Sequence, residues 1–236
     1  MIPFKKLVPG FLGLSSVILS AGAQSQQKDN LPNIIFIVAD DMGYGDIGCF
    51  GAIQYTTPNI DRLAATGMRF TNFYAAQAVS SASRAGLLTG CYPNRVGISG
   101  ALMPKAEIGL NPAEETIAEV LKKRGYKTAA IGKWHLGHHR EFLPLQQGFD
   151  EYLGLPYSND MWPAFYDGTR NIPPEYSRKL DYPELPLIRG NEKIREIRTL
   201  KDQSELTTLY TETAVDFIVR NKNHPFFLYL AHSMTH

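Results

Sequence analysis

The sequence predicts an α/β fold with a parallel sheet covered by helices. One observation is a set of apolar runs, rich in β-branched and aromatic residues, whose length and composition indicate buried strands: 33–38, 126–131 and 225–230. Another is a set of segments between these runs with helix-forming patterns: 57–66, 114–123 and 204–221. In addition, Gly67 and Gly125 follow two of those segments, where glycine commonly ends a helix. Alternating strands and helices are typical of a parallel sheet.

The N-terminal residues 1–30 are expected to lie outside the fold. Lys5 and Lys6 precede an apolar stretch, and small residues ending at Ala23 follow it, which is the pattern of a secretory signal peptide over 1–23. We therefore expect cleavage near Ala23, a flexible leader over 24–30, and export to the periplasm or outside the cell. The apolar stretch is too short and broken for a stable membrane anchor, although an unprocessed N-terminal anchor is the alternative.

The charge balance excludes some classes of partner. The chain has 24 Lys and Arg against 23 Asp and Glu, a net charge of +1, which argues against general binding of nucleic acid or of a membrane surface. An apolar content of 44% suits an ordinary globular core. Cys49 and Cys91 could form one disulfide in an exported chain, and the sequence leaves that question open.

Two adjacent carboxylates follow the first predicted strand. Asp40 and Asp41 come directly after the run 33–38, at the carboxyl end of a strand, where α/β sheets bind ligands. Carboxylate oxygens suit Ca²⁺ or Mg²⁺. An Asp-Asp pair before glycine is more commonly a turn or a helix cap. Two like charges at this position would nevertheless repel each other unless a cation or an arginine neutralised them.

The next segment is expected to be structural. Thr57 suits an N-cap, Pro58 suits the first helical position, and Gly67 ends the helix. Residues 68–74 alternate like a strand and lead the chain to Ser80.

The segment 80–90 combines small hydroxyl residues with an arginine. Ser80 opens it, Arg84 supplies a planar set of donors that matches an oxyanion, and residues 85–89 indicate the first turns of a buried helix that Gly90 ends. A hydroxyl at a helix N-terminus beside an arginine can hold a tetrahedral anion. The alternative is a serine-rich N-cap in front of a core helix.

Two further groups of polar residues follow predicted strands. Lys133 and His135 come just after the strand 126–131 and are two residues apart, so they point the same way on an extended segment. His232 and His236 follow the strand 225–230. The segment 171–198 is rich in proline and charge, with weak periodicity, and is expected to be a long surface excursion at the substrate rim.

Taken together, these segments resemble the type I, formylglycine-dependent sulfatases, in the arylsulfatase A-like branch. The motifs that carry the resemblance follow the family's order and include N-I-I-F-I-V-A-D-D-x-G-Y-G-D from Asn33, the serine type of C/S-x-P/A-S-R with A-x-L-L-T-G from Ser80, G-K-W-H-L-G from Gly132, and P-Y-S-x-D from Pro156. The resemblance covers 31–236 and corresponds to the N-terminal part of the family's catalytic domain. It implies an alkaline-phosphatase-like sandwich with a mixed, largely parallel sheet, truncated before the C-terminal part.

The resemblance also implies roles for individual residues. Ser80 would be converted to formylglycine (3-oxoalanine) by a sulfatase-maturating enzyme, and would ligate Ca²⁺, or Mg²⁺, together with Asp40 and Asp41. The catalytic residues implied are Ser80, Arg84, Lys133, His135 and His236, with Lys133, Ser158 and His236 binding the substrate. The implied reaction is hydrolysis of sulfate monoesters of glycans or of aryl or alkyl compounds. His236 fits the family's sulfate-binding histidine, and His232 ranks second.

Several alternatives remain at this point. Cys91 begins a second match to C-x-P-x-R, the minimal formylglycine pattern. Because it follows the predicted helix instead of preceding it, we expect that Cys91 is a false match and is not the modified residue. A phosphatase or phosphodiesterase of the same superfamily, with Ser80 acting directly, is the alternative enzyme. The Asp-Asn metal pair that the family carries further along is not in the sequence, so an inactive anion-binding fragment is the non-enzymatic alternative.

Overall fold

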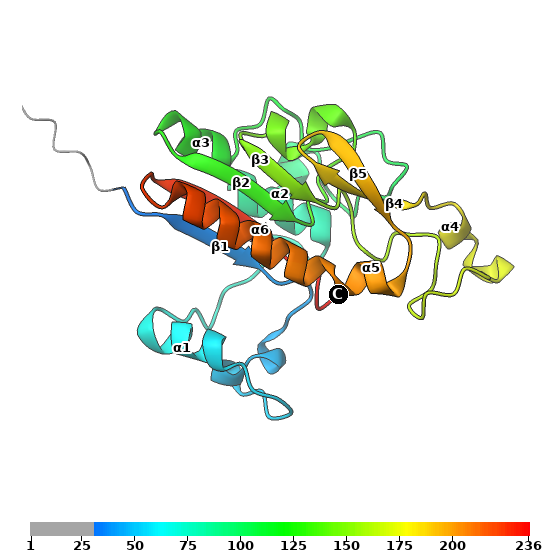
Figure 1. The fold of residues 1–236 in the computed structure, drawn as a ribbon, viewed down its shortest axis with the longest axis horizontal. Coiled ribbons are helices and arrows are strands. Elements are labelled where there is room, and N and C mark those ends of the chain that lie inside the picture. The colour runs from blue at the N-terminus through cyan, green and yellow to red at the C-terminus, as the bar shows by residue number, and fades with distance from the viewer. Residues whose placement is uncertain (1–30) are drawn as a thin grey trace, which may run out of the picture. The chain divides into compact units, whose positions relative to one another are not determined.

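The computed structural model describes residues 31–236 (Figure 1). The signal peptide and leader expected from the sequence lie outside the described residues. Within 31–236, no helix is both long and apolar enough to cross a membrane.

A six-stranded mixed sheet forms the centre of the fold, with strand order β1-β6-β2-β3-β4-β5. Its parallel part consists of β1 (Ile34–Val38), β6 (Phe226–Ala231), β2 (Lys127–Gly132) and β3 (Glu151–Gly154). The strands β4 (Leu185–Arg189) and β5 (Glu192–Ile197) continue it in antiparallel sense. This confirms the predicted mixed, largely parallel sheet.

Helices cover both faces of the sheet. Figure 1 shows α6 (Leu206–Asn221) lying along one face, with α2 (Ser80–Thr89) behind the other. On the α6 face, Tyr210 and Phe217 belong to a core cluster with Leu228 of β6. The remaining α-helices are α1 (Pro58–Thr66), α3 (Ile117–Lys123), α4 (Ser177–Leu180) and α5 (Leu200–Ser204). Short 3-10 helices span Tyr44–Asp46, Gly48–Phe50, Pro93–Val96, Arg140–Phe142, Pro144–Gln146 and Pro174–Tyr176.

The register of the parallel strands positions the functional residues. Val38 of β1 and Gly132 of β2 both pair with Ala231 of β6, so these three strands end at the same level. The residues that follow them therefore emerge at one edge of the sheet. That edge receives Asp40 from β1 and Lys133 from β2.

Three predictions about individual strands are wrong. The run 33–38 was expected to be covered on both faces, but β1 is an edge strand within the described part of the chain, and Ile35 and Ile37 are 47% and 56% exposed. Residues 68–74 form no strand, because they find no partner strand among residues 31–236. The segment 171–198 contributes the β4–β5 hairpin to the sheet instead of only a surface excursion, because alternate residues such as Leu185 and Leu187 are buried.

The predicted helices are confirmed with shifted ends. The helix expected over 114–123 begins only at Ile117, because Thr116 and Glu119 form a capping box in which each side chain accepts the other's backbone N–H. The helix expected from Ser204 is divided into α5 and α6. The helix expected from Ala85 begins five residues earlier, at Ser80.

Candidate active site

The early start of α2 decides where its functional side chains lie. Val79 is the N-cap, Ser80 is the first helical residue, and Gly90 ends the helix with a φ of +68°, a conformation that favours glycine. Ser80 and Arg84 are four residues apart, so they occupy the same face of the helix. That face is directed toward the carboxyl ends of β1 and β2.

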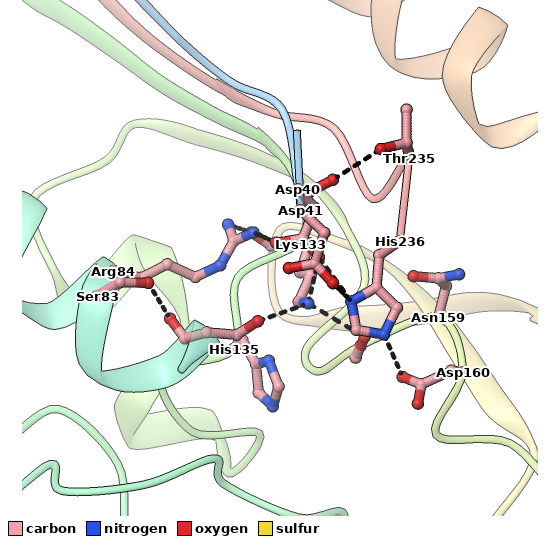
Figure 2. Close-up of polar contacts among 12 residues, drawn as sticks. Asp40, Asp41, Ser83, Arg84, Lys133, His135, Asn159, Asp160, Thr235 and His236 are labelled. Atoms are coloured by element: carbon pink, nitrogen blue, oxygen red, sulfur yellow. Dashed lines mark hydrogen bonds and ion pairs between the residues drawn. The ribbon is translucent and has the colours of Figure 1, made fainter. Parts of the chain in front are cut away.

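Asp40 is the centre of the site, because it pairs with two buried cations (Figure 2). Arg84 donates from Nη2 to Oδ1 of Asp40 at 2.9 Å, and Lys133 donates from Nζ to Oδ2 at 2.5 Å. The side chains of Arg84, Asp40 and Lys133 are only 2%, 7% and 0% exposed. Of the two strand-end carboxylates, Asp40 is therefore neutralised by Arg84 and Lys133, whereas Asp41 contacts His236.

These cations control the ionisation of Asp40. Burial opposes ionisation most strongly, but the charges of Arg84 and Lys133 outweigh it and hold the pKa of the Asp40 carboxyl below its ordinary value. Burial, followed by the charge of Arg84, lowers the pKa of the Lys133 ammonium, and Asp40 acts in the opposite sense. The carboxylate of Asp40 is thus a fixed negative charge between two positive ones.

The guanidinium of Arg84 makes its hydrogen bonds to groups inside the protein. Besides Asp40, its guanidinium donates from Nη1 to the Lys133 carbonyl at 2.8 Å and to the Tyr229 hydroxyl at 3.2 Å. Its Nε is buried without a partner among the described residues. The geometry therefore places Arg84 where it orients Asp40 and Lys133, whereas its predicted direct contact with an anion stays a prediction.

Lys133 joins the helix, the strand end and a third segment. Its Nζ donates to Asp40, to Oγ of Ser80 at 3.1 Å and to Oγ of Ser158 at 3.0 Å. Three oxygens around one nitrogen match the three hydrogens of an ammonium group. Ser80, Lys133 and Ser158, assigned from motifs far apart in the sequence, are thus in direct contact.

His135 is held as a neutral imidazole. Burial, followed by the charges of Lys133 and Arg84, lowers its pKa from 6.5 to about 3. Its Nε2 lies 3.0 Å from the carbonyl oxygen of Leu102, and its Nδ1 is buried without a partner within residues 31–236. Its backbone φ is +60°, a conformation that is uncommon for a residue other than glycine and that is often found at functional sites.

His236 reaches the site from the other side of Asp40 (Figure 2). The bonds from Asp40 N to Met234 O at 3.1 Å and from Thr235 N to Asp40 O at 2.9 Å join the segments that follow β1 and β6. They bring Nδ1 of His236 to 3.1 Å from Asp41 and 3.4 Å from Asp40. His232, the second choice, lies beside the Tyr210 ring instead.

A cavity of about 720 Å³ opens beside these residues. Its polar lining includes Asp40, Asp41, Ser80, Ser83 and Arg84, and apolar residues such as Phe70 and Phe73 contribute the wall. The cavity therefore gives a ligand access to both aspartates and to the hydroxyl of Ser80.

Cys91 lies at the opposite end of α2 from Ser80. The helix has 10 residues, which corresponds to about 15 Å at 1.5 Å per residue. Cys91 is exposed, and both Cys91 and Cys49 are free thiols. The geometry thus favours Ser80 over Cys91 as the residue that belongs to the site, and it shows no disulfide between the two cysteines.

The sequence analysis missed three groups near the site. Asp160 lies 3.5 Å from Nε2 of His236, and it could have been found, because it is the last residue of the P-Y-S-x-D motif. Tyr229 is one of six consecutive buried residues in β6, so nothing in the sequence marks it as different from a core residue. The carbonyl of Leu102 is a backbone group, so no residue type could have indicated it.

Comparisons with known proteins agree with this geometry. The sulfatase family model matches residues 32–236. The chain is 49% identical to human arylsulfatase A over 156 residues, which cover 65% of this chain and 31% of the relative. It is 39% identical to human N-acetylgalactosamine-6-sulfatase over 220 residues, which cover 87% of this chain and 40% of that relative. It resembles the crystal structure of Ps i-CgsB in complex with k-i-k-neocarrahexaose with a TM-score of 0.70 and 34% identity, over 87% of this chain and 46% of that one.

The chain thus spans less than half the length of each of these proteins. The match nevertheless includes every strand and helix of the described residues and every motif of the site. The sheet is that of the alkaline-phosphatase-like fold. The chain belongs to the sulfatase family.

Proposed function

We propose that this protein hydrolyses sulfate monoesters, with Ser80 as the residue converted to formylglycine and a divalent cation held at Asp40 and Asp41. The observation that carries the proposal is the contact of Lys133 with both Ser80 and Asp40 at the head of α2. Through Lys133, this contact joins Ser80, at the position that the family modifies, to Asp40, the carboxylate at the end of β1. The activity is proposed for the whole protein, of which this chain can be a part.

The donor set fits a hard divalent cation. The ligand atoms of Asp40, Asp41 and His236 lie within 4.8 Å of one another. Each carboxylate oxygen has a second lone pair beyond the one that an ion pair uses, so Asp40 can contact a cation and its two basic partners together. Ca²⁺, the first choice, or Mg²⁺ would bring positive charge to the sulfate when bound. Because Ca²⁺ takes about six to eight oxygens, Asp40 and Asp41 would supply part of its ligand shell.

The position of Ser80 fits its proposed modification. It is half-buried, and its Oγ lies in the cavity lining within reach of the Lys133 ammonium. As an aldehyde hydrate, the modified residue would supply one hydroxyl as nucleophile and a second whose proton must be removed to release sulfate. Lys133 would hold the attacking oxygen, and its charge would favour the anion that forms in the transition state.

Two histidines have complementary properties for moving protons. His135 is neutral and buried, with a free lone pair at Nδ1, so it can accept a proton. His236 is exposed to solvent and lies between Asp41 at 3.1 Å and Asp160 at 3.5 Å. We assign proton donation to the leaving alcohol to His236 and proton removal to His135.

A sulfated glycan is the proposed class of substrate. N-acetylgalactosamine-6-sulfatase and the neocarrahexaose complex of Ps i-CgsB are named for carbohydrates, and the chain is similar to both. An aryl or alkyl sulfate is the simpler alternative. We also propose export after cleavage near Ala23, which the N-terminal sequence supports, and modification of Ser80 by a serine-competent maturating enzyme.

The test compares Ser80 with Cys91 in the intact protein, co-expressed with a serine-competent maturating enzyme. Ser80→Ala is expected to abolish sulfate release from an aryl sulfate and a sulfated oligosaccharide, and Cys91→Ala to leave it largely unchanged. Mass spectrometry is expected to find two hydrogens missing at Ser80 and an ordinary thiol at Cys91. An active Ser80→Ala variant, or the aldehyde at Cys91, would contradict the assignment. Release of phosphate but not sulfate would favour the phosphatase alternative.

A further inference from the structure

We propose that Ser81 is a positioning residue for His135 and acts on it through the backbone of Leu102. The proposal rests on the proposed function, because it takes His135 to be the proton acceptor. Ser81 Oγ accepts the N–H of Leu102 at 3.0 Å. The carbonyl of the same residue lies 3.0 Å from Nε2 of His135. A continuous path of hydrogen bonds thus runs from the helix that carries Ser80 to the histidine.

The three residues of this path are buried. Ser81 is 0% exposed, Leu102 8% and His135 2%. Ser81 is also fixed on α2, directly after Ser80, so its hydroxyl is as rigid as the helix. If Ser81 lost its hydroxyl, the N–H of Leu102 would be buried without an acceptor, and the loop would have to move to satisfy it.

The path determines which nitrogen of His135 carries the hydrogen. A carbonyl can only accept, so contact with Leu102 requires the hydrogen to be on Nε2. The lone pair then lies on Nδ1, which is buried and has no partner in the part of the chain that the structure describes. Only this tautomer can accept a proton at Nδ1.

The backbone of His135 cannot enforce this arrangement alone. The N–H of His135 donates to the carbonyl of Pro156 at 3.1 Å, which holds the main chain in its left-handed conformation. That bond fixes the main chain at His135 but does not select the tautomer of its ring. The tautomer depends on the Leu102 carbonyl, and the position of that residue depends on Ser81.

The experiment uses two substitutions of the same shape. Ser81→Thr keeps the hydroxyl and Ser81→Val removes it, while both add bulk to the same buried position. Ser81→Ala adds no bulk. Thr89→Val is the matched control, because it removes a hydroxyl from the far end of α2 that bonds to the Ala85 carbonyl at 2.7 Å. The tautomer of His135 is read from long-range ¹H–¹⁵N correlation spectra of protein with ¹⁵N-labelled histidine, assigned with His135→Gln. Aldehyde content at residue 80, kcat and KM are measured on the same samples.

In the unsubstituted protein we expect the Nε2–H tautomer alone. In Ser81→Val and Ser81→Ala we expect a mixture of tautomers and a fall in kcat of roughly tenfold or more, but no larger than the roughly 10²–10⁴-fold that a proton-transfer group contributes in full. KM and aldehyde content should change little. Ser81→Thr and Thr89→Val should keep the Nε2–H form, and Ser81→Thr should retain most of kcat relative to Ser81→Val.

A single Nε2–H tautomer in both Ser81→Val and Ser81→Ala would overturn the proposal, whatever the activity. Equal loss of kcat in the valine and threonine variants would also overturn it, because bulk and not the hydroxyl would then be responsible. The tautomer is measured without substrate, so a protein that releases no sulfate would contradict the proposed function while the spectra still tested the path.

Discussion

The chain contains two regions that differ in how far the fold buries their side chains. The strand-end centre, defined as Asp40, Arg84, Lys133, His135 and Ser158, consists of buried polar side chains, four of them joined by contacts of 2.5–3.0 Å. The outer segment, residues 42–76, contains α1 and no buried residue. Its large apolar side chains, such as Leu63 and Phe70, are 67% and 64% exposed.

In these two regions, whether a side chain is buried depends on where its segment lies relative to the sheet, and not on whether the side chain is polar or apolar. Asp40 and Lys133 follow strands that both pair with β6, and Arg84 lies on α2 across from them, so the fold covers all three. The apolar residues of the outer segment belong to no strand and cover no face of the sheet among residues 31–236. The contacts within this chain therefore stabilise the centre far more than the outer segment, and we expect the two regions to respond differently to matched substitutions.

The largest expected difference is between two aspartates. Asp40→Asn removes the charge that pairs with Arg84 and Lys133 and leaves two buried cations close together. Breaking a buried pair in this way costs roughly 3–5 kcal/mol. Asp46→Asn in the outer segment affects hydrogen bonds that face solvent, to the Gly43 N–H and the Tyr55 hydroxyl. Denaturant unfolding should show a large loss for the first variant and no resolvable change for the second.

The control for this comparison is the double variant Asp40→Asn with Lys133→Met, which removes one of the two unpaired cations. It should be more stable than Asp40→Asn alone, because the remaining arginine is no longer repelled. If Asp40→Asn and Asp46→Asn lost equal stability, the contrast between the two regions would be incorrect.

The next largest difference is expected for the same change at two leucines. Leu228 of β6 is 0% exposed in the core, whereas Leu63 of α1 is 67% exposed. Leu228→Ala should cost about 2–5 kcal/mol, because it removes buried area and leaves a cavity. Leu63→Ala should change the unfolding free energy by no more than about 0.5 kcal/mol. Chemical denaturation of both variants checks this, and an equal loss at Leu63 would show that the outer segment is packed in solution.

The smallest expected effect is the change in the free energy of unfolding for each unit of pH. The pKa of His135 is about 3 when folded and 6.5 ordinarily, so between these values the unfolded chain binds a proton that the folded chain does not. Stability should therefore fall as the pH falls from 6.5 toward 3, by at most about 1.4 kcal/mol per pH unit. The lowered pKa of Asp40 adds a further loss below its ordinary value of 3.8.

The outer segment contains no histidine, so the loss between pH 6.5 and 4 should arise outside it, from His135 together with His138 and His232, whose pKa values burial also lowers. His135→Gln tests the contribution of His135, because it removes that titrating group. Unfolding of this variant, followed by circular dichroism across the pH range, should show a shallower dependence than the unsubstituted protein. An unchanged slope would assign the dependence to other groups.

The sequence predicted the parts of the site that are encoded as short patterns. Asp40 and Lys133 follow apolar strand runs, Ser80 and Arg84 have helical spacing, and the family motifs named all four, which the structure places together. Gly67, Gly90 and Gly125 marked helix ends correctly, because glycine adopts the required conformations at low cost. Local preferences and periodicity were sufficient for these features.

Other features were decided only by the tertiary structure. Whether β1 is central or at an edge depends on which strands pair with it, and no property of residues 33–38 encodes that. The β4–β5 hairpin in 171–198 gains its order from burial against the core, which overrides the weak periodicity of its sequence. The tautomer of His135 depends on the backbone of Leu102, 33 residues away in sequence. Strand order and backbone acceptors arise from contacts between distant segments, and so they cannot be read from residue types alone.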